Sequence, residues 1–392
     1  MSNNKKKEPK PDKERKPLAI VEVQQALNDW YDLQRNEITG VVEARKIGED
    51  VFREIKEDNL IIQLLNCGHR ISQGILSALL NSEFVPTYNP FKDYFKSLPG
   101  WNGNDVDYIE ALANRVTAVD QSQFNLQFKK MLVRTISCAL DDHSFNKHAF
   151  ILVGREQNTG KSTFCRYLCP KPLEKYFSEN ITLDKDGYIT LAQSLFINLD
   201  ELSTLSKFEL NHLKSLFSKD RISIRHPFGR RVQTDPRRAS FIGSTNEDTF
   251  LSDTTGSVRW LCFEISKINW PYDHIGIDQV WSQAYSLYKS GFKFQLTVDE
   301  LRENELRNQQ FQQFPMEYDY VQKYLEPGNE FDGDLFMTPT EIRDHIISKS
   351  ENRADIKSLE KLGKVLIQLG YTRHSKRIPG RLYSVYGYHV KV

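Results

Sequence analysis

The amino-acid sequence predicts an α/β protein, and three observations lead to this fold class. The apolar run 150–153 passes through a polar loop into Gly-Lys-Ser-Thr at 160–163, which begins a helix-like segment. Two later strand-like runs also end in polar residues, one in Asp200 and Glu201 and the other in Asn246. A helix–helix–strand–strand pattern closes the chain, so a small second domain is expected after the α/β core.

The segment around 160–163 has the strand, loop, Gly-Lys-Ser/Thr and helix order of a P-loop. In such a loop the backbone N–H groups and the helix N-terminus bind nucleotide phosphates. Lys161 is expected to contact the β- and γ-phosphates, and the Ser162 hydroxyl to coordinate Mg²⁺. We therefore predict a site for ATP and Mg²⁺ that is built from Gly154, Asn158, Thr159, Gly160, Lys161, Ser162 and Thr163.

This loop departs from the common pattern in one respect. Five residues separate Gly154 from Gly160, where the usual motif has four, and Arg155 occupies the place of the first glycine. A chance match on an ordinary strand–turn–helix is the alternative. The second half of the motif makes the phosphate and metal contacts, and that half is intact.

The polar residues at the ends of the later strands complete the predicted site. Carboxylates at the end of a buried strand are costly without a cation, so Asp200 is expected near the Mg²⁺ ion. Glu201 is expected to polarise the attacking water. Asn246 would orient that water or touch the γ-phosphate, although an ordinary turn or cap asparagine is the alternative.

Arg259 precedes a final strand-like run and is a candidate catalytic residue. An arginine commonly meets the negative charge on the γ-phosphate in the transition state, either from the same chain or across a subunit interface. A structural salt bridge with Asp253 is the alternative.

A basic segment, residues 219–238, lies between the acidic pair and Asn246. It has seven Lys or Arg residues against two Asp, and its alternation around a turn at 227–229 predicts a hairpin. Lysine and arginine contact DNA phosphates regardless of base sequence. We predict DNA contacts by Arg225, Arg230 and Arg231. A solvated basic face, or arginines that face a neighbouring subunit's nucleotide, are the alternatives.

The C-terminal segment predicts a winged helix that binds DNA. Thr338 is a candidate N-cap and Pro339 a first helical residue, and a leucine-rich second helix ends at Gly370. Two alternating strands follow. The predicted DNA contacts of this hairpin, or wing, are Arg373, Lys376, Arg377 and Arg381. A protein-docking module is the alternative.

Composition and periodicity predict how the chain divides. The net charge of +1 places any nucleic-acid surface in local patches, and the absence of an apolar run near 18 residues predicts a cytoplasmic protein with no membrane partner. The expected parts are a disordered basic tail (1–17), a small α/β module (18–85), a helical region (86–145), the core (146–270), a helical lid or collar (271–328) and the winged helix (329–392).

The motifs of the chain, and the order in which they occur, resemble those of the virulence-associated E family over about residues 85–325. The matching stretches are Gly-Lys-Ser-Thr, Leu-Asp-Glu-Leu, Arg-His-Pro-Phe-Gly-Arg-Arg, Pro-Arg-Arg-Ala-Ser-Phe-Ile-Gly-Ser-Thr-Asn and Phe-Leu-Ser-Asp-Thr-Thr-Gly-Ser-Val-Arg-Trp. The resemblance implies an AAA+ core like that of the superfamily 3 helicases of viruses, plasmids and genomic islands. It also implies that Lys161 is the Walker A lysine, that Asp200 and Glu201 form Walker B, and that Asn246 is sensor 1.

The chain departs from the family pattern at Arg259. Val258-Arg259-Trp260 stands where the family often has paired arginines, so one arginine is left to act as finger or sensor. No primase domain with an acidic metal motif is visible, which makes a separate primase a candidate partner.

These inferences together predict an ATP-dependent DNA helicase or translocase for replication of a mobile genetic element. By the resemblance it would act as a ring oligomer, expected to be a hexamer, on single-stranded or forked DNA. An ATP-switched DNA-binding assembly or loading factor with little unwinding is the alternative. A small-molecule kinase fits poorly, because it explains neither Asn246 nor the C-terminal module.

Overall fold

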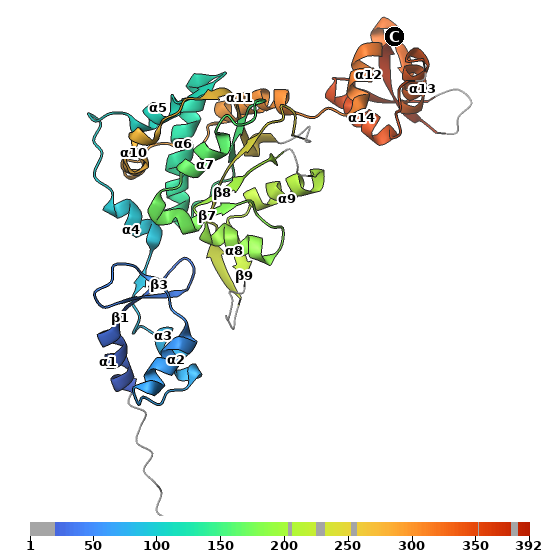
Figure 1. Cartoon of the computed structure of the whole chain (residues 1–392). Helices are drawn as coiled ribbons and strands as arrows, with labels where there is room; N and C mark the ends of the chain where they lie inside the picture. Colours follow the sequence, from blue (N-terminus) through green and yellow to red (C-terminus); the bar gives the residue numbers. More distant parts are fainter. Residues whose placement is uncertain (1–19, 203–205, 225–231, 252–256, 352, 378–382) are drawn as a thin grey trace, which may run out of the picture.

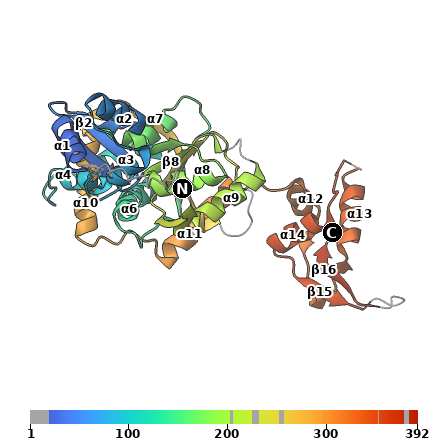
Figure 2. The same ribbon diagram turned by 90° about the horizontal axis from the view of Figure 1, so that it is seen from below.

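The computed structural model describes residues 20–202, 206–224, 232–251, 257–351, 353–377 and 383–392. The tail predicted at 1–17 lies outside these ranges. Along the chain, an N-terminal unit, a central sheet with its helices and a C-terminal unit follow one another (Figure 1). In Figures 1 and 2 the C-terminal unit lies apart from the central sheet.

The N-terminal unit is a four-stranded sheet with three helices. The strand order is β3-β2-β1-β4, and β1 and β2 form an antiparallel hairpin whose turn contains Gly40 at a φ of +73°. The helices bury Leu27, Leu64 and Leu76 in a core of their own. The elements are α1 (Ile20–Trp30), β1 (Tyr31–Asn36), β2 (Val42–Lys46), β3 (Arg53–Glu54), α2 (Glu57–Asn66), α3 (Gln73–Leu80) and β4 (Thr87–Tyr88).

The central sheet confirms the α/β prediction. Five of its strands are parallel, and β5 pairs antiparallel with β12 at one edge, in the order β5-β12-β6-β11-β8-β7. Strand β11 therefore lies between β6 and β8, although it follows both in sequence. The strands are β5 (Val116–Ala118), β6 (Ala149–Val153), β7 (Phe177–Glu179), β8 (Phe196–Leu199), β11 (Ser240–Thr245) and β12 (Trp260–Ile268).

Alternation along the strands gives the sheet two buried faces. Phe150 and Leu152 of β6 join one hydrophobic cluster, while Ile151 and Val153 join the other. The first face is covered by α4 (Pro90–Ser97), α5 (Tyr108–Ala113), α6 (Gln121–Leu140), α7 (Lys161–Tyr167) and α10 (Ile277–Lys289). The second face is covered by α8 (Lys185–Gln193) and α9 (Lys207–Phe217), as Figure 1 shows.

The helices predicted as a separate region and as a lid belong to this core. Helices α5, α6 and α10 pack on one another over the sheet, and the buried Trp281 of α10 donates to the Leu168 carbonyl at 3.0 Å. Helix α11 (Val298–Asn308) covers the edge of β12, where Asn304 and Asn308 donate to the Trp260 carbonyl. The sequence did not place these helices on the sheet, because periodicity identifies a helix but not the surface that its apolar face meets.

The C-terminal unit begins at α12, earlier than predicted. Val321 and Leu325 share a hydrophobic core with Leu366 and Val390. Pro327 also belongs to this unit, because it pairs with Val390 across two strands. The elements are α12 (Met316–Tyr324), β13 (Glu326–Pro327), β14 (Leu335–Met337), α13 (Pro339–Lys349), α14 (Leu359–Gln368), β15 (Arg373–Lys376) and β16 (Val385–Lys391).

The helix start and the helix end that the sequence predicted in this unit are both present. The Thr338 side chain accepts from the Glu341 backbone N–H in a capping box, with Pro339 as the first helical residue. Helix α14 ends before Gly370, which has a φ of +87°. Strands β15 and β16 pair antiparallel, and the wing tip with Arg381 lies outside the described residues.

Candidate functional site

A cavity of about 350 Å³ opens at the carboxyl ends of β6, β8 and β11. These ends lie together because the three strands are parallel neighbours. The cavity is lined by Gln157, Asn158, Thr159, Gly160, Lys161, Ser162, Thr163, Asp200, Glu201, Ser244, Thr245 and Asn246. The structure thus gathers every residue predicted for phosphate, metal or catalysis except Gly154 and Arg259.

The loop before α7 is shaped by two left-handed residues. Asn158 has a φ of 59° and Gly160, the N-cap of α7, a φ of 85°; glycine and asparagine tolerate this conformation best. The Lys161 ammonium donates to the Gly154 carbonyl at 2.9 Å, the Glu156 carbonyl at 2.8 Å and the Thr159 hydroxyl at 3.0 Å. The longer loop therefore still folds back around the lysine.

Lys161 is buried, with 6% of its surface exposed. Burial lowers the pKa of Lys161, while the negative charges of Asp200 and Glu156 act in the opposite direction. A buried ammonium that is held only by carbonyl and hydroxyl oxygens is able to exchange them for phosphate oxygens.

Gly154 does not itself line the cavity, although its carbonyl accepts from Lys161, and it packs closely against a neighbouring strand. A Cβ at this position would lie 2.9 Å from the Ile265 carbonyl oxygen of β12. Its backbone N–H donates to the Thr245 carbonyl at 3.1 Å, which ties the loop to β11. Arg155 is largely exposed and forms an ion pair with Asp248. The close backbone approach at Gly154 is therefore to a neighbouring strand, and its phosphate contact stays a prediction.

Asp200 and Ser162, the two residues predicted to hold Mg²⁺, lie in contact with each other. The Ser162 hydroxyl donates to Asp200 Oδ1 at 2.9 Å, and the Ser244 hydroxyl donates to the same oxygen at 2.8 Å. The Glu201 backbone N–H also reaches it at 3.2 Å. Hydroxyl and carboxylate oxygens are the ligands that Mg²⁺ prefers. This donor set therefore fits Mg²⁺.

Glu201 lines the cavity with an unusual backbone. Its φ is +52°, a conformation that costs a non-glycine residue about 1–3 kcal/mol and that concentrates at functional sites. The residue follows directly on Asp200, so the left-handed turn allows two successive acids to border one cavity. This strain supports a functional role for the Glu201 carboxylate.

Two residues around Asp200 were missed by the sequence interpretation. Arg166 lies one helical turn after Ser162 on α7, and its guanidinium contacts Glu179 at 2.5 Å and Asp200 at 3.8 Å. Ser244 lies two residues before Asn246 on β11. The i, i+4 spacing and the strand alternation were available signals in each case.

Arg259 lies at the opposite end of the sheet. It ends a short 3₁₀ turn (Ser257–Arg259) just before β12, and Trp260 pairs with Ala149 at the amino end of β6. The cavity begins beyond Val153, roughly 13 Å further along the strand at 3.3 Å per residue. Arg259 donates instead to the Ser218 hydroxyl at 2.9 Å. It therefore does not reach the cavity of its own chain. The alternative partner Asp253 lies outside the described residues.

The basic segment forms the predicted hairpin, but two of its arginines are structural. Strands β9 (Arg221–Ile224) and β10 (Gln233–Pro236) pair antiparallel, and the tip that holds Arg225, Arg230 and Arg231 lies outside the described residues. Arg237 is buried and donates to the Phe217 and Ala239 carbonyls at 2.9 and 3.0 Å. Arg238 donates to the Ala139 carbonyl and to Asp142.

The cations predicted on the C-terminal hairpin are exposed. Arg373, Lys376 and Arg377 all face solvent. The Lys376 ammonium also lies 3.7 Å from the Glu330 carboxylate.

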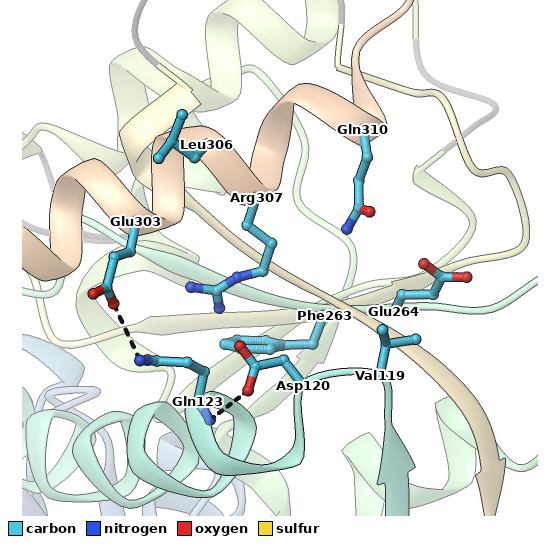
Figure 3. Close-up of a pocket in the computed structure, with 9 residues that line it drawn as sticks. All are labelled: Val119, Asp120, Gln123, Phe263, Glu264, Glu303, Leu306, Arg307 and Gln310. Carbon is cyan, nitrogen blue, oxygen red and sulfur yellow. Dashed lines mark hydrogen bonds between the residues drawn. The ribbon is translucent and has the colours of Figure 1, made fainter.

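A second cavity of about 460 Å³ lies at the outer edge of β12, between α6 and α11 (Figure 3). The Arg307 guanidinium stacks over the Phe263 ring at 4.7 Å, and burial lowers the pKa of Arg307. Gln123 donates to Glu303 at 3.1 Å across its wall. None of the predicted site residues lines this cavity.

The mostly parallel sheet with helices on both faces defines an α/β protein, and the sequence assigns it to a family. The virulence-associated protein E-like domain matches residues 96–313, which is more than half of the chain. The chain therefore belongs to this family, as the sequence motifs predicted.

Solved structures of the C-terminal region of NrS-1 share the fold. An apo structure of its region 305–718 has a TM-score of 0.52 at 15% identity, over 96% of this chain and 100% of that chain. An A-form apo structure gives 0.52 at 14%, over 96% and 99%, and another gives 0.51 at 13%, over 94% and 98%. No curated protein matches this chain. Among the described residues, no helix has the length and apolarity that a membrane span needs.

Proposed function

We propose that this protein is a Mg²⁺-dependent ATPase with an AAA+ core. The observation that carries the proposal is the single cavity that joins Lys161, Asp200, Glu201 and Asn246. These residues come from a P-loop and from the ends of two further parallel strands. The strand order supports the same proposal, because β11 inserts between the loop strand β6 and the acidic strand β8.

The residues have distinct roles in the proposed reaction. Loop N–H groups and the N-terminus of α7 bind the phosphates, and Lys161 neutralises their charge. Ser162 and Asp200 would hold Mg²⁺, which supplies further charge neutralisation when bound. Glu201 takes the proton from the attacking water, and Asn246 orients that water.

The position of Arg259 leads us to propose an oligomer. This arginine lies at the amino end of the sheet and cannot serve its own cavity. In a ring of identical subunits, proposed to be a hexamer, Arg259 of one copy would complete the site of the next. An active site at each subunit interface would then couple hydrolysis to movement around the ring.

We propose that the ATPase acts on DNA, as a helicase or translocase in replication of a mobile element. The C-terminal unit supports this, because apart from the two-residue β13 its elements follow in the order of a winged helix, α12-β14-α13-α14-β15-β16, with an exposed basic hairpin. Membership of the virulence-associated E-like family, whose motifs resemble those of the superfamily 3 helicases of mobile elements, also supports a replication-associated role. Strand displacement on forked DNA with ATP distinguishes this proposal from a loading factor, which would hydrolyse ATP without unwinding.

Two substitutions test the ATPase itself. Lys161→Ala should abolish nucleotide binding, because it removes the phosphate contact. Glu201→Gln should keep ATP binding and slow hydrolysis by roughly 10²–10⁴-fold, because it removes only the carboxylate that takes the proton from the attacking water. Glu247→Gln is the matched control, since this nearby carboxylate does not line the cavity. Wild-type turnover in Glu201→Gln would show that the acid is assigned wrongly.

A further inference from the structure

The hairpin β15–β16 exposes an aromatic ring beside a cation. Tyr386 is 57% exposed, and the guanidinium carbon of Arg373 lies 4.2 Å from the centroid of its ring. A single exposed apolar residue needs no explanation. A cation stacked on that ring, however, fixes its orientation at some cost in side-chain entropy, and so presents a rigid flat surface to solvent.

Strand register places this pair on the face of the hairpin that carries the helices. Arg373 pairs with Tyr388, and Ser375 pairs with Tyr386, so these four residues share one face. Tyr388 is buried in the core, and a Cβ at Gly363 of α14 would lie 3.6 Å from its hydroxyl. Tyr386 is the next residue on that face toward the tip, beyond the last buried side chain.

The other face of the hairpin differs in its charge. There the Lys376 ammonium lies 5.6 Å from the Phe336 ring centroid, but its charge is paired with Glu330. Arg373 has no ion pair with any residue that the structure describes. The guanidinium on the helix-bearing face therefore keeps its full charge for a ligand.

The charge of the whole hairpin favours a polyanion. Over 373–377 and 383–391 the sequence has no acidic residue and four cations, which are Arg373, Lys376, Arg377 and Lys391. A ligand with regularly spaced negative charges and flat apolar groups fits a basic strand with an exposed ring. Single-stranded nucleic acid has both, and its bases stack on aromatic side chains. In a duplex the base faces are already stacked on one another.

We propose that Tyr386 is a stacking platform for an unpaired base of single-stranded DNA. Arg373 holds the ring from one side and contacts an adjacent phosphate. The inference rests on the proposed DNA function of the C-terminal unit, and it narrows the DNA to a strand with free bases. Winged modules bind through a helix and charged contacts, whereas this site would add recognition of unpaired bases.

The test titrates the full chain, without nucleotide, with fluorescent oligo-dT of about 20 nucleotides, an abasic strand of equal length and charge, and the matching duplex. Tyr386→Ala should weaken oligo-dT binding about fivefold or more and leave abasic-strand binding unchanged. Tyr386→Phe should bind like the wild type, because it keeps the ring. Arg373→Ala should weaken both single strands and reduce the log–log salt slope by about 0.7.

Phe331→Ala is the matched control. Phe331 is an equally isolated ring, 94% exposed, but it lies between Glu330 and Asp332 and should not meet a polyanion. The proposal is overturned if Tyr386→Ala binds oligo-dT normally, loses abasic-strand binding equally, or loses duplex binding as much. ATP hydrolysis without DNA is measured on the same variants. A wild type that stacks bases but hydrolyses no ATP would refute the ATPase proposal alone.

Discussion

The two ends of the central sheet differ in what they hold. At the carboxyl ends, Lys161, Asp200 and Asn246 converge on one cavity. At the amino ends lie the half-buried Arg259 and the buried Arg237, and each is hydrogen-bonded within its own chain. One subunit therefore carries most of the residues of the proposed ATP site at one end of the sheet and the catalytic candidate Arg259 at the other. The proposed oligomer would join the two ends across a subunit interface.

The largest expected effect comes from a substitution of Arg259, which tests whether the two ends of the sheet act together across a subunit interface. Arg259→Ala should reduce ATP hydrolysis by roughly 10³-fold or more, because a transition-state arginine contributes on that scale. Mixing the inactive Arg259→Ala and Lys161→Ala proteins should restore part of the activity, since a mixed ring contains some intact interfaces. ATP hydrolysis as a function of protein concentration and mixing ratio is the measurement.

Ser218→Ala is the control for Arg259, because it removes the hydrogen-bond partner within the chain and keeps the guanidinium. It should retain activity. Full specific activity of a dilute monomer, or failure of the mixture to regain any activity, would contradict a shared site.

The second prediction concerns stability at the amino end. Arg237→Ala removes the donor for two buried carbonyls, those of Phe217 and Ala239, and the packing of a fully buried side chain. The free energy of unfolding should fall by about 2–5 kcal/mol. The exposed Arg221→Ala in the same basic segment should change it by less than about 0.5 kcal/mol. Chemical denaturation measures the free energy of unfolding of both variants. Equal values would show that the buried Arg237 guanidinium does not stabilise the fold.

The carboxyl end was largely predictable from sequence, because its residues belong to local motifs. Lys161 follows a loop, and Asp200 and Asn246 follow apolar strands, so each position is set within a few residues of chain. Arg237 and α10 were not predictable in the same way. In a basic segment the sequence does not distinguish an arginine that becomes buried from one that stays exposed. A helical hydrophobic pattern does not show which surface the helix packs against. The surfaces that such residues meet depend on chain segments far away in sequence.

The third prediction compares two serines on one strand. Ser244 and Ser240 both lie on β11, and only Ser244 donates to Asp200. Ser244→Ala should lower ATP hydrolysis about tenfold, because a hydrogen bond to a charged group contributes about 1.5–3 kcal/mol. Ser240 lies at the amino end and accepts from Asn146, so Ser240→Ala should leave hydrolysis unchanged. If both variants lost the same fraction of ATP hydrolysis, the contact between Ser244 and Asp200 would not explain the loss.

The smallest expected effect is a pH dependence at the amino end. His148 precedes β6 and is buried; burial lowers its pKa from 6.5 to about 2, and the charges of Arg134, Lys147, Arg237 and Arg259 act in the same direction. The folded state therefore keeps this imidazole neutral, whereas the unfolded chain binds a proton below about pH 6.5. Since the unfolded state then binds more protons, stability falls as the pH drops below about 6.5 and is fully present above it. The loss should approach about 1.4 kcal/mol per pH unit.

His148→Gln should flatten this part of the stability–pH profile, because glutamine does not titrate. His143→Gln, at an exposed histidine nearby, should leave the profile as it is in the wild type. Denaturation midpoints between about pH 7 and 5 measure the difference between the two variants. An unchanged acid slope in His148→Gln would mean that the buried imidazole takes up its proton within the folded protein, and that the cations of the amino end do not keep it neutral.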